Sequence, residues 1–161
     1  MRISEEIFPR MVCLIISVNK EGKANVMTAS FLMPVSFEPK YSAFSISPKR
    51  YTFQNLKEVP EFTLNLLSKG MKKEAIICGS YSGREIDKFK KANLITEKSK
   101  TISPPVIKCP ISFECRIAEM KEYGDHFLVI GKILKEWIRE QKFIPLLHKS
   151  GDIFMEPKVL E

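Results

Sequence analysis

The sequence lacks the patterns that mark membrane proteins and secreted proteins. Its longest apolar run, residues 11–16, has the length of a strand and falls well short of the roughly 20 residues that a membrane-crossing helix needs. The first residues contain no apolar stretch like that of a secretory signal. We therefore expect a cytoplasmic protein that does not bind a membrane.

Cysteine and histidine are scarce, and neither forms a known motif. The four cysteines, Cys13, Cys78, Cys109 and Cys115, stand singly, without a Cys-x-x-Cys pair or a histidine at zinc-finger spacing. Local signatures of a hydrolase triad and the Walker and Rossmann glycine patterns are also missing. We expect no metal site, and cysteines that act as small hydrophobic side chains. Chemistry on an organic cofactor is then the natural class for an enzyme.

The chain carries an excess of positive charge without a nucleic-acid-binding stripe. It has 26 lysines and arginines against 19 acids, a net charge of +7. The basic residues are scattered beside acids on probable helices, and no stacked aromatic residues interleave with them. A solvated lysine-rich surface is therefore favoured over a small barrel that binds nucleic acid, which stays the least favoured alternative. A positive field also suits an anionic cofactor or a dinucleotide substrate.

The apolar periodicity is typical of strands over most of the chain. It predicts strands at residues 11–18, 41–47, 62–66, 111–117 and 127–137, with the last two joined as an antiparallel hairpin and with apolar odd and polar even positions in 111–117. Short helices are predicted at 52–58, 71–78 and 85–91. Strand and helix do not alternate regularly, so we expect one mainly β domain over residues 1–161, an antiparallel barrel with a few peripheral helices.

Residues 45–52 have the composition of a phosphate site. Pro48 favours a turn, and Thr52 then stands where a helix N-cap would be. The free N–H groups and positive dipole of a helix N-terminus, together with Arg50 and the hydroxyls of Ser47 and Thr52, can bind a phosphate. The alternative is an ordinary capped helix with a surface arginine.

Residues 25–30 are polar where a strand is expected to be apolar. Ala29 is small enough for a flat ring to approach its backbone, and main-chain N–H groups and hydroxyls can bond the polar edge of a flavin ring. The alternative is a turn that reverses the chain. His126, at a predicted hairpin tip, is either an exposed loop residue or a group that positions a substrate or passes a proton. We interpret His148 as structural.

Several motifs occur in an order that resembles a known family. They are Asn-Val-Met-Thr-Ala-Ser at 25–30, Ser-x-Ser-Pro-x-Arg-x-Thr at 45–52, Glu-Phe-x-x-Asn at 61–65, Asp-Lys-Phe at 87–89, Phe-Glu-Cys at 113–115 and Gly-Asp-His at 124–126. Over roughly residues 8–140 the chain is similar to the flavin reductase-like, FMN-binding split-barrel family. The resemblance implies a six-stranded antiparallel Greek-key barrel that works as a homodimer with a flavin in each interface groove.

The resemblance also implies a role for individual residues of this chain. The flavin ring and ribityl chain would be faced by Asn25, Met27, Thr28, Ala29 and Ser30, and the same groove would be lined by Ser45, Ile46 and Ser47. Arg50 and Thr52 would hold the phosphate, and Lys88 would approach the flavin from the covering loop and helix. His126 would lie where nicotinamide stacks.

The function expected from the resemblance is that of an FMN-binding oxidoreductase. It would pass electrons from NAD(P)H through bound flavin to free flavin, ferric iron or a protein partner. FAD is the alternative cofactor. The alternative function is a flavoredoxin-type electron carrier without its own NAD(P)H site.

Overall fold

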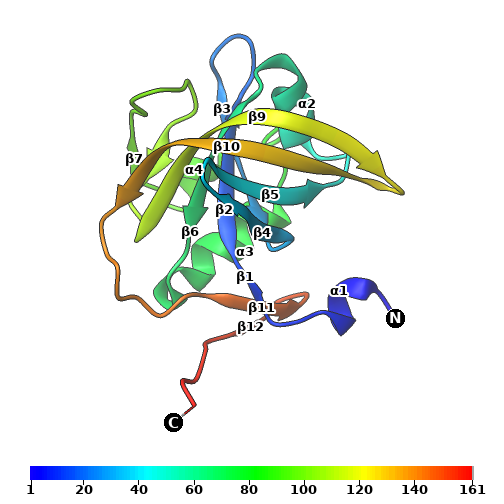
Figure 1. The fold of residues 1–161 in the computed structure, drawn as a ribbon, viewed down its shortest axis with the longest axis vertical. Helices are drawn as coiled ribbons and strands as arrows, with labels where there is room; N and C mark the ends of the chain where they lie inside the picture. Colours follow the sequence, from blue (N-terminus) through cyan, green and yellow to red (C-terminus); the bar gives the residue numbers. More distant parts are fainter. Residues whose placement is uncertain (161) are drawn as a thin grey trace.

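A computed structural model describes residues 1–160, and its centre is a seven-stranded sheet (Figure 1). The strand order is β3-β2-β6-β9-β10-β5-β4, and all neighbours are antiparallel. The strands are β2 (Cys13–Val18), β3 (Ala24–Ala29), β4 (Leu32–Phe37), β5 (Lys40–Ile46), β6 (Glu61–Leu66), β9 (Ile111–Tyr123) and β10 (His126–Ile138). The expected mainly β fold is confirmed, and edge strand β4 brings the sheet to seven strands.

Smaller elements surround this sheet. A three-stranded sheet, in the order β1-β11-β12, joins β1 (Arg10–Met11) to the carboxy-terminal strands β11 (Leu147–Ser150) and β12 (Ile153–Met155). The remaining elements are α1 (Ile3–Glu6), α2 (Tyr51–Glu58), η1 (Lys69–Met71), α3 (Lys72–Ser80), α4 (Lys88–Lys91), β7 (Thr96–Glu97) and β8 (Val106–Ile107). Over residues 1–160, no helix has the length and apolarity to cross a membrane.

Strand β2 lies between two hydrophobic cores. All six of its residues are buried, and alternate side chains point to opposite faces of a strand. Cys13 and Ile15 belong to the barrel core with Phe44 and Phe62, whereas Leu14 and Ile16 pack in a second core with residues of α3. Helix α3 therefore covers one face of the β2–β3 pair, and the barrel interior covers the other.

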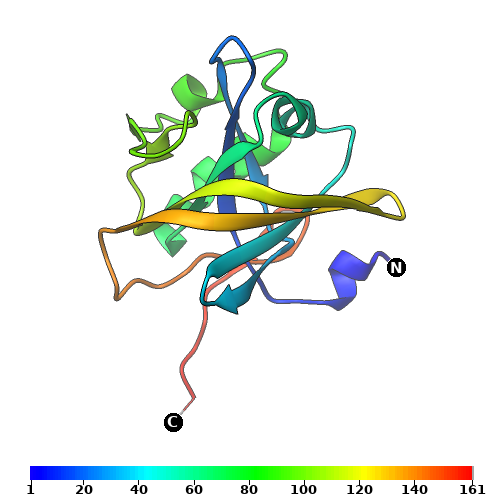
Figure 2. The ribbon, with the colours of Figure 1, turned by 45° about the horizontal axis from the view of Figure 1, so that its top comes forward.

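The β9–β10 hairpin crosses the molecule and extends past the sheet on the side of α1 (Figures 1 and 2). Each of its strands has 13 residues. A register shift follows Ile130, and at Gly131 an added Cβ would lie only 2.5 Å from Cζ of Phe62. Glycine at this position lets β10 pack directly against the barrel core. The hairpin carries His126 at its projecting end.

The predicted strands are confirmed in position, but the prediction that the even-numbered residues of β9 form a polar, exposed face is wrong. Ser112 and Glu114 of β9 are fully buried, although the alternation placed them with the polar positions. The carboxylate of Glu114 accepts hydrogen bonds from the backbone N–H groups of Lys100 and Thr101, from the Thr101 hydroxyl and from Nε1 of Trp137, at 2.5–2.8 Å. The segment before β8 thus covers this face of the sheet.

The predicted helices are confirmed at α2 and α3, whereas the third is shorter than expected. Residues 83–85 form a turn, and α4 begins only at Lys88. The side chain of Asp87 accepts a hydrogen bond from the backbone N–H of Lys90 at 3.1 Å and caps the helix there. Strands β4, β11 and β12 had not been predicted.

Replacing Glu114 with glutamine is expected to lower the free energy of unfolding by about 2 kcal/mol, because an amide cannot accept all four hydrogen bonds. Burial raises the pKa of Glu114, but the hydrogen bonds outweigh it and hold the pKa below its ordinary value of 4.5. A depressed pKa stabilises the fold above pH 4.5, and this stabilisation is lost as pH falls through the folded-state pKa. Urea unfolding at pH 7 and at pH 3.5 measures both effects, with the exposed Glu119→Gln on the same strand as control. Equal stability of wild type and Glu114→Gln at pH 7 would contradict this account.

Candidate functional site

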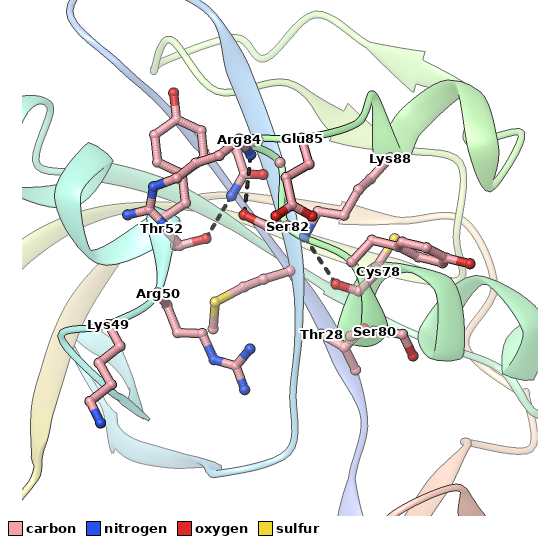
Figure 3. Close-up of a pocket in the computed structure, with 16 residues that line it drawn as sticks. Thr28, Lys49, Arg50, Thr52, Cys78, Ser80, Ser82, Arg84, Glu85 and Lys88 are labelled. Atoms are coloured by element: carbon pink, nitrogen blue, oxygen red, sulfur yellow. Dashed lines mark hydrogen bonds between the residues drawn. The ribbon is translucent and has the colours of Figure 1, made fainter.

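A polar cavity of about 310 Å³ lies at the open edge of β3, between the start of α2 and the end of α3 (Figure 3). It is lined by Asn25, Met27, Thr28, residues 49–52, residues 78–85 and Lys88. Because β3 is an edge strand, part of its backbone N–H and C=O groups point away from β2 and toward this side. Backbone and side chains can therefore both bind a ligand here.

Helix α2 begins at the cavity without a side-chain cap. Its N-cap is Arg50, and the prediction that Thr52 caps the helix is wrong. Thr52 lies in the first turn, is only 1% exposed, and its Oγ1 accepts a hydrogen bond from Nδ2 of Asn25 at 2.9 Å. The first N–H groups of α2 and the positive end of its dipole are consequently available to an anion, beside the Arg50 side chain.

Asn25 presents an unsatisfied acceptor at the same place. Its side chain is 4% exposed, and within residues 1–160 its Oδ1 has no hydrogen-bond partner. A Cβ added to Gly83 would lie 1.9 Å from this oxygen, so only glycine lets the loop of residues 81–87 come so close to β3. A buried acceptor without a partner is costly, and a ligand with a hydroxyl or N–H donor would satisfy it.

Four basic side chains and one acid surround the cavity. Lys49, Arg50, Arg84 and Lys88 outnumber Glu85, and the Arg84 guanidinium lies over the ring of Tyr51, 4.9 Å from its centroid (Figure 3). This end of the site therefore favours an anion, and phosphate is the group that such donors and a helix N-terminus bind together.

Lys88 is the most buried of these basic side chains. It is 5% exposed, and its Nζ donates to the carbonyl oxygen of Cys78 at 3.0 Å. Burial lowers the pKa of Lys88 to about 8; the nearby Cys78 thiol opposes this shift, and the Arg50 charge adds to it. The ammonium group is thus held at the cavity with few bonds of its own and is charged at neutral pH.

Thr28 connects β3 to α3 at the floor of the site. Its hydroxyl donates to the carbonyl oxygen of Ala75 at 2.6 Å, so the hydroxyl oxygen offers the cavity only lone pairs. A second cavity of about 360 Å³ shares Thr28, Arg50 and residues 79–80 with the first and continues to Ser30 and Phe31. The site is therefore a groove with a cationic end at the start of α2 and an opposite end at Ser30 and Phe31, where Arg2 and Arg10 also line the second cavity.

An apolar cavity of about 340 Å³ adjoins that opposite end. Ser30 and Phe31 line it together with Ser45, and its other walls come from α1, β4 and β5, with Arg10 of β1 and Leu128 of β10. Its position shows that the polar groove opens directly onto an uncovered apolar surface, next to edge strand β4.

The structure brings most of the expected site residues to this groove. The first cavity contains Asn25, Met27, Thr28, Arg50, Thr52 and Lys88, the second adds Ser30, and the apolar cavity contains Ser45. The side chains of Ala29 and Ile46 pack in the barrel core instead, so only their backbones can face the groove. Ser47 lies in the turn before α2, where its carbonyl oxygen accepts from the N–H of Arg50 at 3.1 Å.

His126 stands beside the groove, outside the three cavities. Its Nδ1 lies 2.8 Å from Oδ1 of Asp125, and its ring centroid lies 6.1 Å from that of Phe31. Because Phe31 lines both the polar groove and the apolar cavity, it connects His126 to the site. Asp125 orients the imidazole and leaves Nε2 for another partner.

Sequence reasoning missed four residues at this site: Arg10, Phe31, Arg84 and His148. Arg84 lies one residue before the helix predicted at 85–91, and no local pattern gives it a role. His148 has no chemical partner nearby in the sequence, because Ser30 and Arg10 approach it only in the fold, each with a side-chain atom 3.1 Å from its Nδ1. Within residues 1–160, no group of three or more histidine, cysteine or acidic residues could hold a metal ion.

Known proteins are similar to this chain in sequence. An uncharacterized protein of Archaeoglobus fulgidus is 36% identical over 131 residues, which cover 81% of this chain and 73% of that protein. A flavin reductase of Pseudomonas putida is 23% identical over 144 residues, 89% of this chain and 82% of that protein.

Solved structures show the same architecture. A flavoredoxin from Methanosarcina acetivorans superposes with a TM-score of 0.85 at 26% identity, and the superposition covers 100% of this chain and 92% of the flavoredoxin chain. A split-barrel domain protein from Shewanella frigidimarina gives 0.89 at 16% identity, with 99% and 87% covered. The mainly β fold is therefore that of the split barrels. A model of the family described as "Flavin reductase like domain" matches residues 4–155, and the chain belongs to this family.

Proposed function

We propose that this chain is an FMN-binding oxidoreductase that passes electrons from NAD(P)H through the flavin to free flavin, ferric iron or a protein partner. The observation that carries the proposal is the groove at β3, with an uncapped helix N-terminus and basic side chains at one end and Ser30 and Phe31 at the other. Similarity to a flavin reductase and to a flavoredoxin supports the same class of function.

The residues present fit a phosphate-bearing flavin. Arg50, Lys88 and the first N–H groups of α2 would hold the phosphate. The unpartnered Oδ1 of Asn25 matches a hydroxyl donor such as the ribityl chain carries. The loop at Gly83 lies against Asn25 at the cationic end, and we propose FMN, a cofactor that ends in a monophosphate, in preference to FAD.

The bound flavin would supply hydride and electron transfer. The protein would bind and orient the flavin and exclude water from it. Thr28 and Ser30 would bind the polar side of the cofactor. His126, with its Nδ1 proton held by Asp125, would position the nicotinamide or hold a proton at Nε2. The ring of Phe31 supplies an apolar face between His126 and the groove.

A second copy of the chain would cover the apolar side of the site. Edge strand β4 exposes Met33, Val35 and Phe37, the last of them 94% exposed. An apolar edge strand is a surface for pairing or packing with another chain. The homodimer would thereby close the apolar cavity beside Ser30 and Ser45.

Arg50→Ala is expected to weaken FMN binding at least tenfold, because a charge-assisted contact to phosphate contributes roughly 1.5 to 3 kcal/mol. Riboflavin lacks the phosphate, so its affinity should stay within about twofold of wild type. Titration of apoprotein by flavin fluorescence measures both ligands. Arg116→Ala is the control, an exposed β9 arginine that pairs with Glu61 at 3.1 Å. Unchanged FMN affinity in Arg50→Ala would remove Arg50 from the site, and a protein that binds no flavin would end the proposal.

FMN affinity is expected to fall as pH rises from 7 through the Lys88 pKa of about 8, because the neutral amine no longer attracts phosphate. Cys78, whose pKa burial raises to about 11, stays protonated over this range. Isothermal titration of wild type and Lys88→Met at pH 7 and 9 measures the effect. The variant should bind FMN weakly at both values, and an equal pH dependence in both proteins would show that Lys88 is not responsible.

His126→Ala is expected to slow anaerobic bleaching of the bound flavin by NADH or NADPH at least about tenfold, with FMN still bound, because a positioned acid–base group contributes rate enhancements of this order or more. Stopped-flow absorbance in the visible flavin band measures the rate, and reduction by dithionite is the control that the flavin remains accessible. Equal rates in the variant would make His126 a loop residue. A wild-type flavin that dithionite reduces and neither nucleotide reduces would instead favour the flavoredoxin-type carrier.

A further inference from the structure

Three side chains from distant parts of the chain meet at the Ser30 end of the groove. Arg10 comes from β1, Ser30 follows β3, and His148 belongs to β11, and all three line the second cavity. Nδ1 of His148 lies 3.1 Å from Oγ of Ser30 and 3.1 Å from Nη2 of Arg10. The proposed function above leaves His148 without a role.

The cluster is rigidly held. Arg10 donates from Nη1 to the carbonyl oxygen of Ser4 at 2.7 Å and from Nη2 to that of Lys149 at 2.8 Å. These bonds connect the amino-terminal segment to the β11–β12 hairpin, where β1 also pairs with β11. The guanidinium and imidazole therefore keep a fixed position beneath Ser30.

The partners of His148 determine the direction of each hydrogen bond. Nε2 lies 2.9 Å from the carbonyl oxygen of Gly151, which can only accept, so Nε2 carries the ring proton. Nδ1 of the neutral ring is then an acceptor with a single lone pair, which Nη2 of Arg10 and the Ser30 hydroxyl share in a three-centre hydrogen bond at 3.1 Å each.

This arrangement gives the Ser30 hydroxyl a fixed polarity. Its single proton is donated to His148, so it presents only lone pairs to the groove. Within residues 1–160, Oγ has one other hydrogen bond, which it accepts from Nε of Arg10 at 3.5 Å and which is long enough to leave acceptor capacity free. A free serine could donate or accept equally well, whereas Ser30 is set to accept.

We propose that His148 is a positioning residue that sets Ser30 as a hydrogen-bond acceptor for the imide N3–H of the flavin ring. This inference rests on the proposed function, which brings the ring to the Ser30 end of the groove. The oxidised isoalloxazine carries one N–H on its pyrimidine edge, between two carbonyl oxygens, and an acceptor placed there recognises that donor and repels the carbonyls. His148 thereby determines which edge of the ring this site accepts.

The test compares FMN with FMN methylated at N3, a ligand that keeps the phosphate and loses the donor. Wild-type apoprotein is expected to bind FMN about tenfold more tightly than the methylated ligand, the effect of one hydrogen bond to a buried partner. In His148→Leu the Ser30 hydroxyl is free to donate to a ring carbonyl, and the preference should fall to about twofold or less. His148→Asn retains an acceptor near the Nδ1 position and should keep the wild-type preference.

Ser30→Ala removes the acceptor directly and provides a second route if the β11–β12 hairpin does not tolerate leucine. It too should lose the preference while binding FMN through the phosphate end. Equal binding of the two ligands by wild type, or an unchanged preference in His148→Leu and Ser30→Ala, overturns the inference while flavin binding itself stands. Failure of wild type to bind either ligand overturns the proposed function, and this inference with it.

Discussion

Burial of β2 on both faces is the constraint on which the rest of the structure depends. Its six apolar or small side chains, from Cys13 to Val18, supply one row to the barrel core and one to the core beneath α3. A strand buried in this way needs cover on each side, which α2 and the barrel interior give on one face and α3 gives on the other. The neighbouring strand β3 is thereby held between two helices with one edge left open.

Hydrogen bonds to the two helices stabilise β3, although this strand is rich in polar residues. Nδ2 of Asn25 donates to Thr52 of α2, and the Thr28 hydroxyl donates to the Ala75 carbonyl of α3, so each side chain is bonded to a helix and Oδ1 of Asn25 stays without a partner in the described residues. The same contacts fix the uncapped start of α2 and the end of α3 on either side of the groove. Structural polar contacts and binding surface are therefore built from the same residues, and the groove is formed before a ligand arrives.

Much of the fold and part of the site could be predicted locally. Strand periodicity located β2, β5, β6, β9 and β10, and the Pro48–Arg50 segment located the start of α2 to within a residue. Strand β4 was missed because Pro34 breaks its pattern. Burial of Glu114 was missed because its four donors come from residues 100, 101 and 137, and no local pattern reports such contacts. Placement of Ala29 and Ile46 in the core likewise depends on which face of each strand turns inward.

The sequence by itself determined the predominance of strands, the basic character of the chain and the chemical kinds of side chain available to a phosphate and a ring, because periodicity, charge and residue type are local properties. Only the tertiary structure decided that Thr52 bonds Asn25 and does not cap α2, that Lys88 is buried at the groove, and that His148 meets Ser30 and Arg10. Each of these depends on the packing of segments distant in sequence. The direction of a hydrogen bond and the pKa of a lysine are set by neighbours that only the folded chain brings within a few ångströms.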